Sequence, residues 1–183
     1  MSTPDGSHAL GPESGTLTVQ TRRTGAAAKA GHDLVIDVTA WAGTLDLGAA
    51  PAITLTADAR SLRVREGRGG LQALGDDDKS NIRKTIDKEI LKGTTISFRS
   101  TSVTPGDGGR LSVAGELELG GRRAPLTFDL ALGGDGRLTG SATVKQSAWG
   151  IMPYSTLFGT LKVVDEVEVV VDADITKKGP AHG

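Results

Sequence analysis

The chain has no cysteine, only three histidines, and aromatic residues at just 3% of its 183 positions. Without cysteine, disulfides, thiolate zinc sites and thiol nucleophiles are excluded. The histidines are scattered, at His8, His32 and His182, and leave little material for an imidazole metal site. We therefore expect no metal and no cofactor.

A charge excess of one sign is also missing, because 21 lysines and arginines stand against 22 aspartates and glutamates, a net charge of −1. This balance provides no broad basic field for a nucleic-acid backbone, so no nucleic-acid partner is expected. Only Arg60–Arg68 is locally basic. We favour a solvated loop there over a phosphate site.

Long hydrophobic runs are absent as well. Residues 1–14 contain neither the charged segment nor the apolar run of a secretion signal or membrane anchor. Because small and polar residues dominate them, we expect a disordered arm at 1–14, a similar tail at 177–183, and one domain at 15–176. We expect a cytoplasmic protein without stable membrane insertion.

What the chain does contain is glycine, 26 residues dispersed between segments, such as 34–38, in which apolar and polar residues alternate. Alternation with a period of two is typical of antiparallel strands with one buried face. Glycine-rich turns at 105–109, 120–121 and 133–136 predict a four-stranded meander over residues 95–146. About eight strands without intervening helices indicate an all-β fold, either an up-and-down barrel or a sandwich.

Two features interrupt the alternation. Val38 and Trp41 both fit an inward face only if the strand carries a β-bulge near Thr39–Ala40, as strands do at a barrel corner. Residues 76–91 repeat isoleucine every fourth position after three aspartates, which predicts a helix covering a rim or open end of the barrel. An alanine-rich segment at 24–30 indicates a second, shorter helical turn.

His32–Asp33 is the one candidate for a catalytic pair. Adjacent residues of an extended chain point to opposite faces, so they cannot act as a base and its orienting partner. No Gly-x-Ser-x-Gly nucleophile motif occurs either. We favour a structural role at the start of a strand, the alternative being that His32 hydrogen-bonds a ligand at a cavity mouth. No enzymatic activity is expected.

Other charged or glycine-rich segments also favour structural roles. Asp76–Asp78 lacks the spacing of an EF-hand and fits a helix cap. Glu166 and Glu168 share the polar face of a strand and are expected to point to solvent. The glycine-rich turns at 105–109 and 133–136 lack the Lys-Ser/Thr ending of a phosphate-binding loop.

The segment 149–159 concentrates apolar residues, including Trp149, Tyr154 and Phe158. A loop of this kind must bury itself or serve as a contact surface. We prefer packing across a barrel opening, as a lid or mouth, and core filling is the alternative.

Four segments resemble the YceI-like family. They are LELGGRRAPLTF at 117–128, similar to its central hairpin, LKVVDEVEVVV at 161–171, similar to its final strand, the Phe-x-Ser segment at 95–101, and Val38-x-x-Trp41-x-Gly43. The resemblance covers roughly residues 15–175. It implies an eight-stranded antiparallel lipocalin-like barrel that holds a long apolar chain, typically a polyisoprenoid or fatty amide, and no general enzymatic activity.

The residues themselves agree with such a container, because an eight-stranded barrel holds one slender ligand only if its lumen is underfilled. Small residues occupy the expected inward positions Ala57, Ala59, Ser100, Gly115, Gly140 and Ala142. Each buried CH₂ of a ligand gains about 0.8 kcal/mol, so we hypothesise a passive carrier or sensor of a polyisoprenoid or fatty-acyl lipid. The residues expected to contact it are His32, Leu34, Ile36, Val38, Trp41, Leu55, Ala57, Phe98, Leu117, Phe128, Leu130, Val144, Tyr154, Phe158, Val167 and Val169. His32, Tyr154 and Phe158 are expected at the mouth.

The alternative is an interaction or scaffold protein whose barrel is filled by side chains. It would dock a partner, or a second copy to give a homodimer, through residues 149–159. A hydrolase is a distant third hypothesis.

Overall fold

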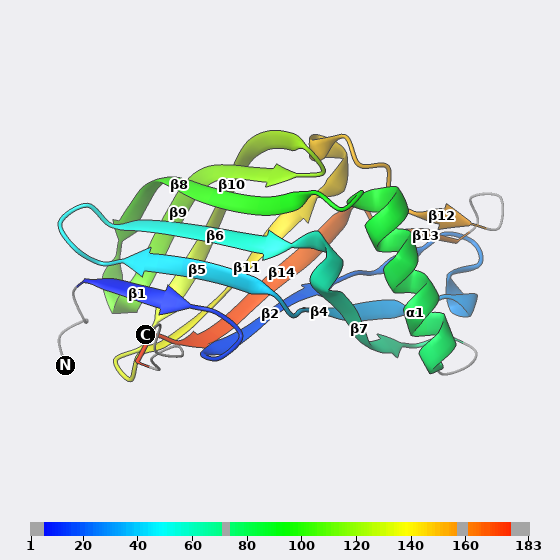
Figure 1. Ribbon diagram of the computed structural model, residues 1–183, viewed down its shortest axis with the longest axis horizontal. Coiled ribbons are helices and arrows are strands. Elements are labelled where there is room, and N and C mark those ends of the chain that lie inside the picture. Colours follow the sequence, from blue (N-terminus) through cyan, green and yellow to red (C-terminus); the bar gives the residue numbers. More distant parts are fainter. Residues whose placement is uncertain (1–5, 71–73, 157–160, 177–183) are drawn as a thin grey trace.

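The computed structural model describes residues 6–70, 74–156 and 161–176, and antiparallel strands dominate them (Figure 1). Eleven strands form one curled sheet, and each pairs with its neighbours in an antiparallel register. In spatial order they are β1 (Ser7–Leu10), β5 (Trp41–Asp46), β6 (Ala52–Asp58), β8 (Thr95–Pro105), β9 (Arg110–Leu119), β10 (Arg122–Leu132), β11 (Arg137–Lys145), β14 (Glu166–Asp174), β2 (Gly15–Gln20), β4 (Asp33–Val38) and β7 (Leu62–Arg68). The all-β prediction is confirmed.

Strands β8 to β11 form the predicted meander. Each pairs with the next along the chain, and the turns fall at the three glycine-rich segments that separate them. Within the meander the inward residues oppose one another, for example Phe98 with Leu117 and Val113 with Phe128. Local hairpin pairing therefore builds four of the eleven strands of the curled sheet.

In place of the β-bulge expected near Thr39–Ala40, the chain has a break between two strands, and the recorded register shift of β4 lies earlier, between Val35 and Ile36. Strand β4 ends at Val38 and β5 begins at Trp41, and both side chains are buried. The Thr39 N–H donates to the carbonyl of Ser61 over 3.0 Å, which joins the bend to the short helical turn η2 (Ala59–Ser61) between β6 and β7. Because β4 pairs with β7 and β5 pairs with β6, one long hairpin bends at its middle.

This bend explains why the sheet has eleven strands where eight were predicted. It divides each strand of the long hairpin into two, and β1 adds a strand at the edge. Strand β1 also corrects the expectation of a disordered arm over residues 1–14. Leu10 pairs with Gly43 on β5 and is buried, and Ser14 is buried in hydrogen bonds with Gly11. The expected tail at 177–183 lies outside the described residues.

Helix α1 (Asp76–Thr85) and a small second sheet lie at one end of the curled sheet (Figure 1). The helix continues into a π-helical turn, η3 (Ile86–Ile90), as the isoleucine repeat predicts. The backbone N–H of Gly75 donates to the Asp78 carboxylate over 3.1 Å, so one of the three aspartates caps the helix. The remaining elements are β3 (Arg23–Thr24), β12 (Ser155–Thr156), β13 (Leu161–Val163), η1 (Ala28–Ala30), η4 (Asp107–Gly109) and η5 (Gln146–Trp149).

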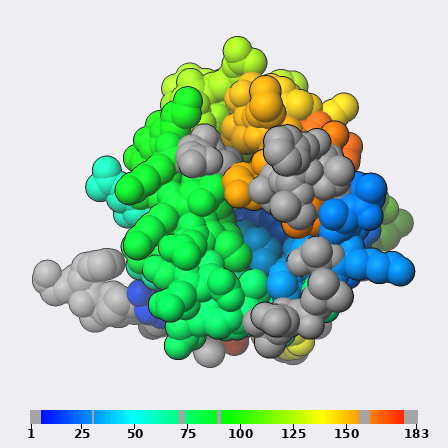
Figure 2. Space-filling model, turned by 90° about the vertical axis from the view of Figure 1, so that its right-hand side faces the viewer, coloured from blue at the N-terminus to red at the C-terminus, as the bar shows by residue number. Residues whose placement is uncertain are grey.

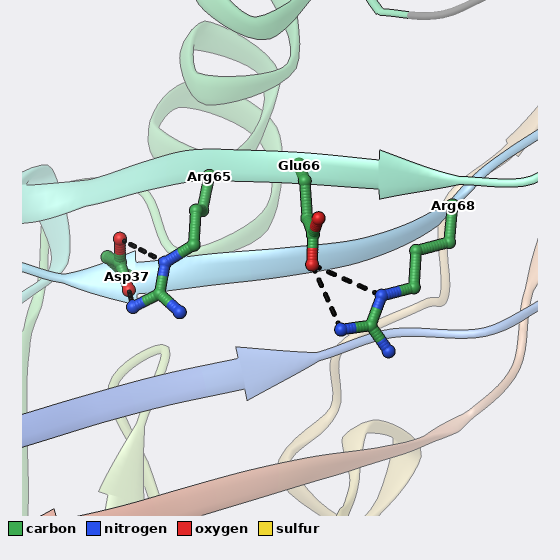
Figure 3. Close-up of polar contacts among 4 residues, drawn as sticks. All are labelled: Asp37, Arg65, Glu66 and Arg68. Atoms are coloured by element: carbon green, nitrogen blue, oxygen red, sulfur yellow. Dashed lines mark hydrogen bonds and ion pairs between the residues drawn. The ribbon is translucent and has the colours of Figure 1, made fainter.

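The outer face of the sheet carries ion pairs (Figure 3). Arg65 Nε donates to Asp37 Oδ2 over 3.0 Å, and Arg68 Nη2 donates to Glu66 over 2.9 Å. The hydrogen bond with Asp37 raises the pKa of Arg65 above its ordinary value. The basic segment 60–68, expected as a solvated loop, is therefore mostly strand β7, and two of its cations are already paired.

Candidate ligand-binding cavity

The inner face of the sheet encloses a cavity of about 560 Å³. Its wall is mainly aliphatic and aromatic, with contributions from most strands of the curled sheet and from α1. This volume falls within the range of roughly 300–1,000 Å³ that small-molecule sites have. The inward side chains of the barrel therefore leave space for an apolar ligand.

Fifteen of the sixteen residues expected to contact a ligand line this cavity. They are His32, Leu34, Ile36, Val38, Trp41, Leu55, Ala57, Phe98, Leu117, Phe128, Leu130, Val144, Tyr154, Val167 and Val169. The remaining one, Phe158, lies outside the described residues. Period-two alternation sends every second side chain of a strand to the same face, which is why so many of these positions meet.

The small inward residues divide into two groups. Ala57, Gly140 and Ala142 line the cavity. Gly115 does not, because a Cβ there would lie 2.6 Å from the Phe98 ring, which covers it. The Phe98 and Phe128 rings are 5.2 Å apart at their centroids, so aromatic packing fills this part of the lumen.

Ser100 and Ala59 were also expected to leave space in the lumen, but neither is part of the described cavity wall. The Ser100 hydroxyl accepts the backbone N–H of Ile53 over 2.9 Å. Ala59 is buried in the η2 turn at the bend of the long hairpin. The cavity therefore lies beside Ala57, Gly140 and Ala142 rather than along every small position.

The end of the sheet opposite α1 is closely packed. Leu45 and Leu138 are 0% and 1% exposed, and Leu10 and Ala173 beside them are also buried. Leu10 and Leu138 form part of the cavity wall there. We call this region the packed end.

At the other end the cavity opens, and Figure 2 looks into this end. The space-filling view shows a recess between α1 (green), the segment around residues 150–156 (orange) and residues 20–35 (blue). Polar side chains gather in the cavity wall on this side, namely Thr21, Arg23, His32, Asn81, Gln146, Tyr154 and Lys162. We call this rim the mouth.

Arg23 is held in place at the mouth by several contacts. Its Nη1 donates to the carbonyl of Arg68 over 2.8 Å and lies 3.4 Å from Asp33 Oδ1. Asp33 also accepts the backbone N–H of Arg23 over 2.8 Å. The described bonds of the Asp33 carboxylate therefore go to the backbone and the side chain of Arg23.

Two glycines after β7 allow the backbone to pass close to Arg23 and His32 at the mouth. Gly69 and Gly70 have φ of +79° and +78°, a region that side chains rarely adopt. A Cβ on Gly69 would lie 2.3 Å from the Arg23 guanidinium, and one on Gly70 would lie 2.4 Å from His32 Nε2. Glycine is therefore required for this packing.

The segment 149–159 combines both roles that were considered for it. Trp149 is buried, its Nε1–H donates to the Leu117 carbonyl over 2.7 Å, and it is not among the residues that line the cavity. Ile151 and Tyr154 line the cavity, whereas Met152 between them is 86% exposed. Core filling thus applies to Trp149, and a position at the mouth applies to Tyr154.

Several residues of the wall were missed at the sequence level. Leu17, Leu138 and Val171 alternate along their strands, and Ile82 and Ile86 form the helical stripe, so the pattern was available for them. Arg23, Gln146 and Lys162 gave no such signal. Gln146 is buried and its Nε2 donates to the Val164 carbonyl over 3.4 Å, an arrangement that only the tertiary structure creates.

The described part of the chain offers no group of three or more histidine or acidic side chains placed to hold a metal ion. Among the same residues, no helix is long and apolar enough to cross a membrane.

Comparisons with known proteins agree with this architecture. A crystal structure of Burkholderia cenocepacia BcnA has 14% sequence identity and a TM-score of 0.63, and the match covers 86% of this chain and 94% of that one. A polyisoprenoid binding domain from Saccharophagus degradans has 9% identity and a TM-score of 0.56, with 94% and 99% covered. A Campylobacter jejuni YceI protein has 13% identity and a TM-score of 0.54, with 79% and 85% covered.

These identities are low, so the structural matches establish a shared fold. No curated protein sequence matches the chain. The family model described as the YceI-like domain, however, matches residues 12–175, nearly the whole chain. The protein therefore belongs to the YceI-like family.

Proposed function

We propose that the protein binds a long apolar molecule, a polyisoprenoid or a fatty-acyl or fatty-amide lipid, and carries or senses it without catalysing a reaction. The observation that carries this proposal is the 560 Å³ cavity, which is walled mainly by apolar side chains and left unfilled by them. The Saccharophagus degradans domain, described as polyisoprenoid binding, supports the choice of ligand class.

The shape of the wall supports a slender ligand. If the two bent strands of the long hairpin are each counted as one and β1 is left out, the wall has eight strands, and we infer an eight-stranded barrel. Such a barrel has room for one small ligand. Ten methylenes buried in it would gain roughly 8 kcal/mol, comparable with the cost of association, about 4–15 kcal/mol.

The two ends of the cavity set the orientation of the ligand. The hydrocarbon tail fits against Trp41, Phe128, Val144 and Val169 in the interior. A polar head group fits at the mouth, where His32 and Tyr154 lie. That Phe158 guards the mouth stays a prediction.

Solvent extraction of the purified protein, followed by mass spectrometry, tests the proposal. We expect a molecule with a long apolar chain at about one per protein, or stoichiometric uptake of an added prenyl alcohol or fatty amide by an empty preparation. A preparation that yields no lipid on extraction and also takes up none of the added ligand would refute the proposal. The alternative of a barrel filled by side chains does not fit a cavity of this volume.

A further inference from the structure

Met152 is the most exposed large apolar side chain of the described residues, at 86%, and it lies at the mouth. Ile151, directly before it, and Tyr154, two residues after it, both line the cavity. Tyr154 is itself 42% exposed. An apolar tip and a half-exposed tyrosine therefore project from the edge of an apolar cavity.

Four cations belong to segments on this side of the mouth. The Arg122 guanidinium lies about 3 Å from where a Cβ of Gly150 would be, two residues from Met152. Lys162 is opposite Ser155 in the small sheet. Arg22 is next to β13, since its carbonyl accepts the Val164 N–H over 2.8 Å, and Lys29 belongs to η1, which packs on β13. Within the described part of the chain none of these four cations forms an ion pair with a carboxylate.

Most carboxylates on this side of the mouth already have partners. Asp33 faces Arg23, Glu118 faces Arg123, and Asp165 accepts the Ser147 hydroxyl. Glu166 is opposite Lys145 in the register of β11 and β14. The aspartates at the start of α1 lie on the opposite side of the mouth. The excess positive charge is therefore local to Met152 and not spread around the whole rim.

We propose that this side of the mouth docks on the surface of an anionic lipid bilayer, with Met152 inserted among the acyl chains and Arg22, Lys29, Arg122 and Lys162 on the lipid phosphates. The combination of an apolar tip, an interfacial tyrosine and unpaired cations is what binding at such a surface requires. Docking in this orientation turns the mouth toward the bilayer, so a lipid tail can move between membrane and cavity with little exposure to water. This inference rests on the proposed function.

Flotation with lipid vesicles tests the docking surface. The probes are vesicles of phosphatidylcholine alone and of phosphatidylcholine with phosphatidylglycerol, each mixed with the full chain at low and high salt. The test variants are Met152→Asp and Arg122→Glu, neither of which lines the cavity. Matched controls are Ala50→Asp, in the exposed turn near the packed end, and Arg63→Glu, whose described side-chain bonds go to the backbone carbonyls of Arg60 and Leu62.

We expect the wild type to bind the anionic vesicles and to dissociate in high salt. A single cation near such a surface contributes roughly fivefold to binding, so Arg122→Glu and Met152→Asp should each lower it about tenfold or more. The two controls should lower it less than twofold. Binding that is absent, or equally weakened by Ala50→Asp and Met152→Asp, would overturn the docking surface.

A second readout separates this inference from the proposed function. All five proteins are titrated with a soluble fluorescent acyl probe without vesicles. Unchanged probe affinity in Met152→Asp, together with lost flotation, supports docking through the rim. Flotation without any probe binding would refute the cavity function and leave the docking surface in place. Probe binding without flotation would refute the docking surface and leave the cavity function in place.

Discussion

The packed end and the mouth of the same sheet differ in almost every physical respect. At the packed end Leu45 and Leu138 are 0% and 1% exposed, whereas at the mouth Met152 is 86% exposed. The mouth instead gathers Arg23, His32 and Lys162 around an opening. Packing at one end stabilises the wall, and under the proposed function the open end is where a ligand would enter and leave.

Truncation of one side chain at each end should produce the largest contrast. Leu45→Ala removes a fully buried side chain that does not line the cavity, so the free energy of unfolding should fall by about 2–5 kcal/mol. Tyr154→Ala, at a position 42% exposed, should lower it by less than about 1 kcal/mol. Urea denaturation measures both values. Similar losses at the two ends would break the comparison.

Filling the cavity should affect binding more than stability. Ala142 lines the cavity on β11, and a phenylalanine there would displace two or three ligand carbons, worth roughly 2 kcal/mol or more than tenfold in affinity. Ala131→Phe adds the same side chain at an exposed position on β10 and should leave affinity unchanged. Titration with a fluorescent acyl probe compares them. Equal affinity in both variants would place the ligand elsewhere.

Low pH should lower the thermal stability by protonating exposed carboxylates and should leave the cavity unchanged. This is the smallest of the expected effects. At the packed end, the hydrogen bond from Arg137 lowers the pKa of Asp172 below its ordinary 3.8. A depressed pKa means that the stabilisation is complete above the unfolded value and is lost as the pH falls through the folded one. Asp172→Asn should therefore flatten the loss of thermal stability below about pH 3.8. A slope identical to that of the wild type would contradict this.

The Ser147 hydroxyl, at the mouth end, likewise lowers the pKa of Asp165. Ser147→Ala should therefore also flatten the loss of thermal stability at low pH. Probe affinity at neutral pH should not change, because neither residue lines the cavity. A loss of affinity in Ser147→Ala would show that this bond shapes the mouth.

The sequence predicts the wall of the cavity far better than its ends. Alternation alone places Ile36, Val144 and Val169 on one face, because side-chain direction along a strand is a local property. The strand β1 was missed because it forms by pairing with β5, more than thirty residues further along the chain, and that pairing is not local. Arg23 and Gln146 were missed for the same reason, since contacts with distant segments hold both at the cavity.

The two tryptophans provide the most direct test of a cavity that takes up an apolar chain. Trp41 lines the cavity, and Trp149 is equally buried but is not among the lining residues. A brominated fatty acid, which quenches tryptophan fluorescence at contact, is titrated into Trp149→Phe and into Trp41→Phe. We predict saturable quenching at one ligand per protein in Trp149→Phe, where Trp41 remains, and little in Trp41→Phe. No quenching of Trp41, or equal quenching of both, would contradict a ligand in the lumen.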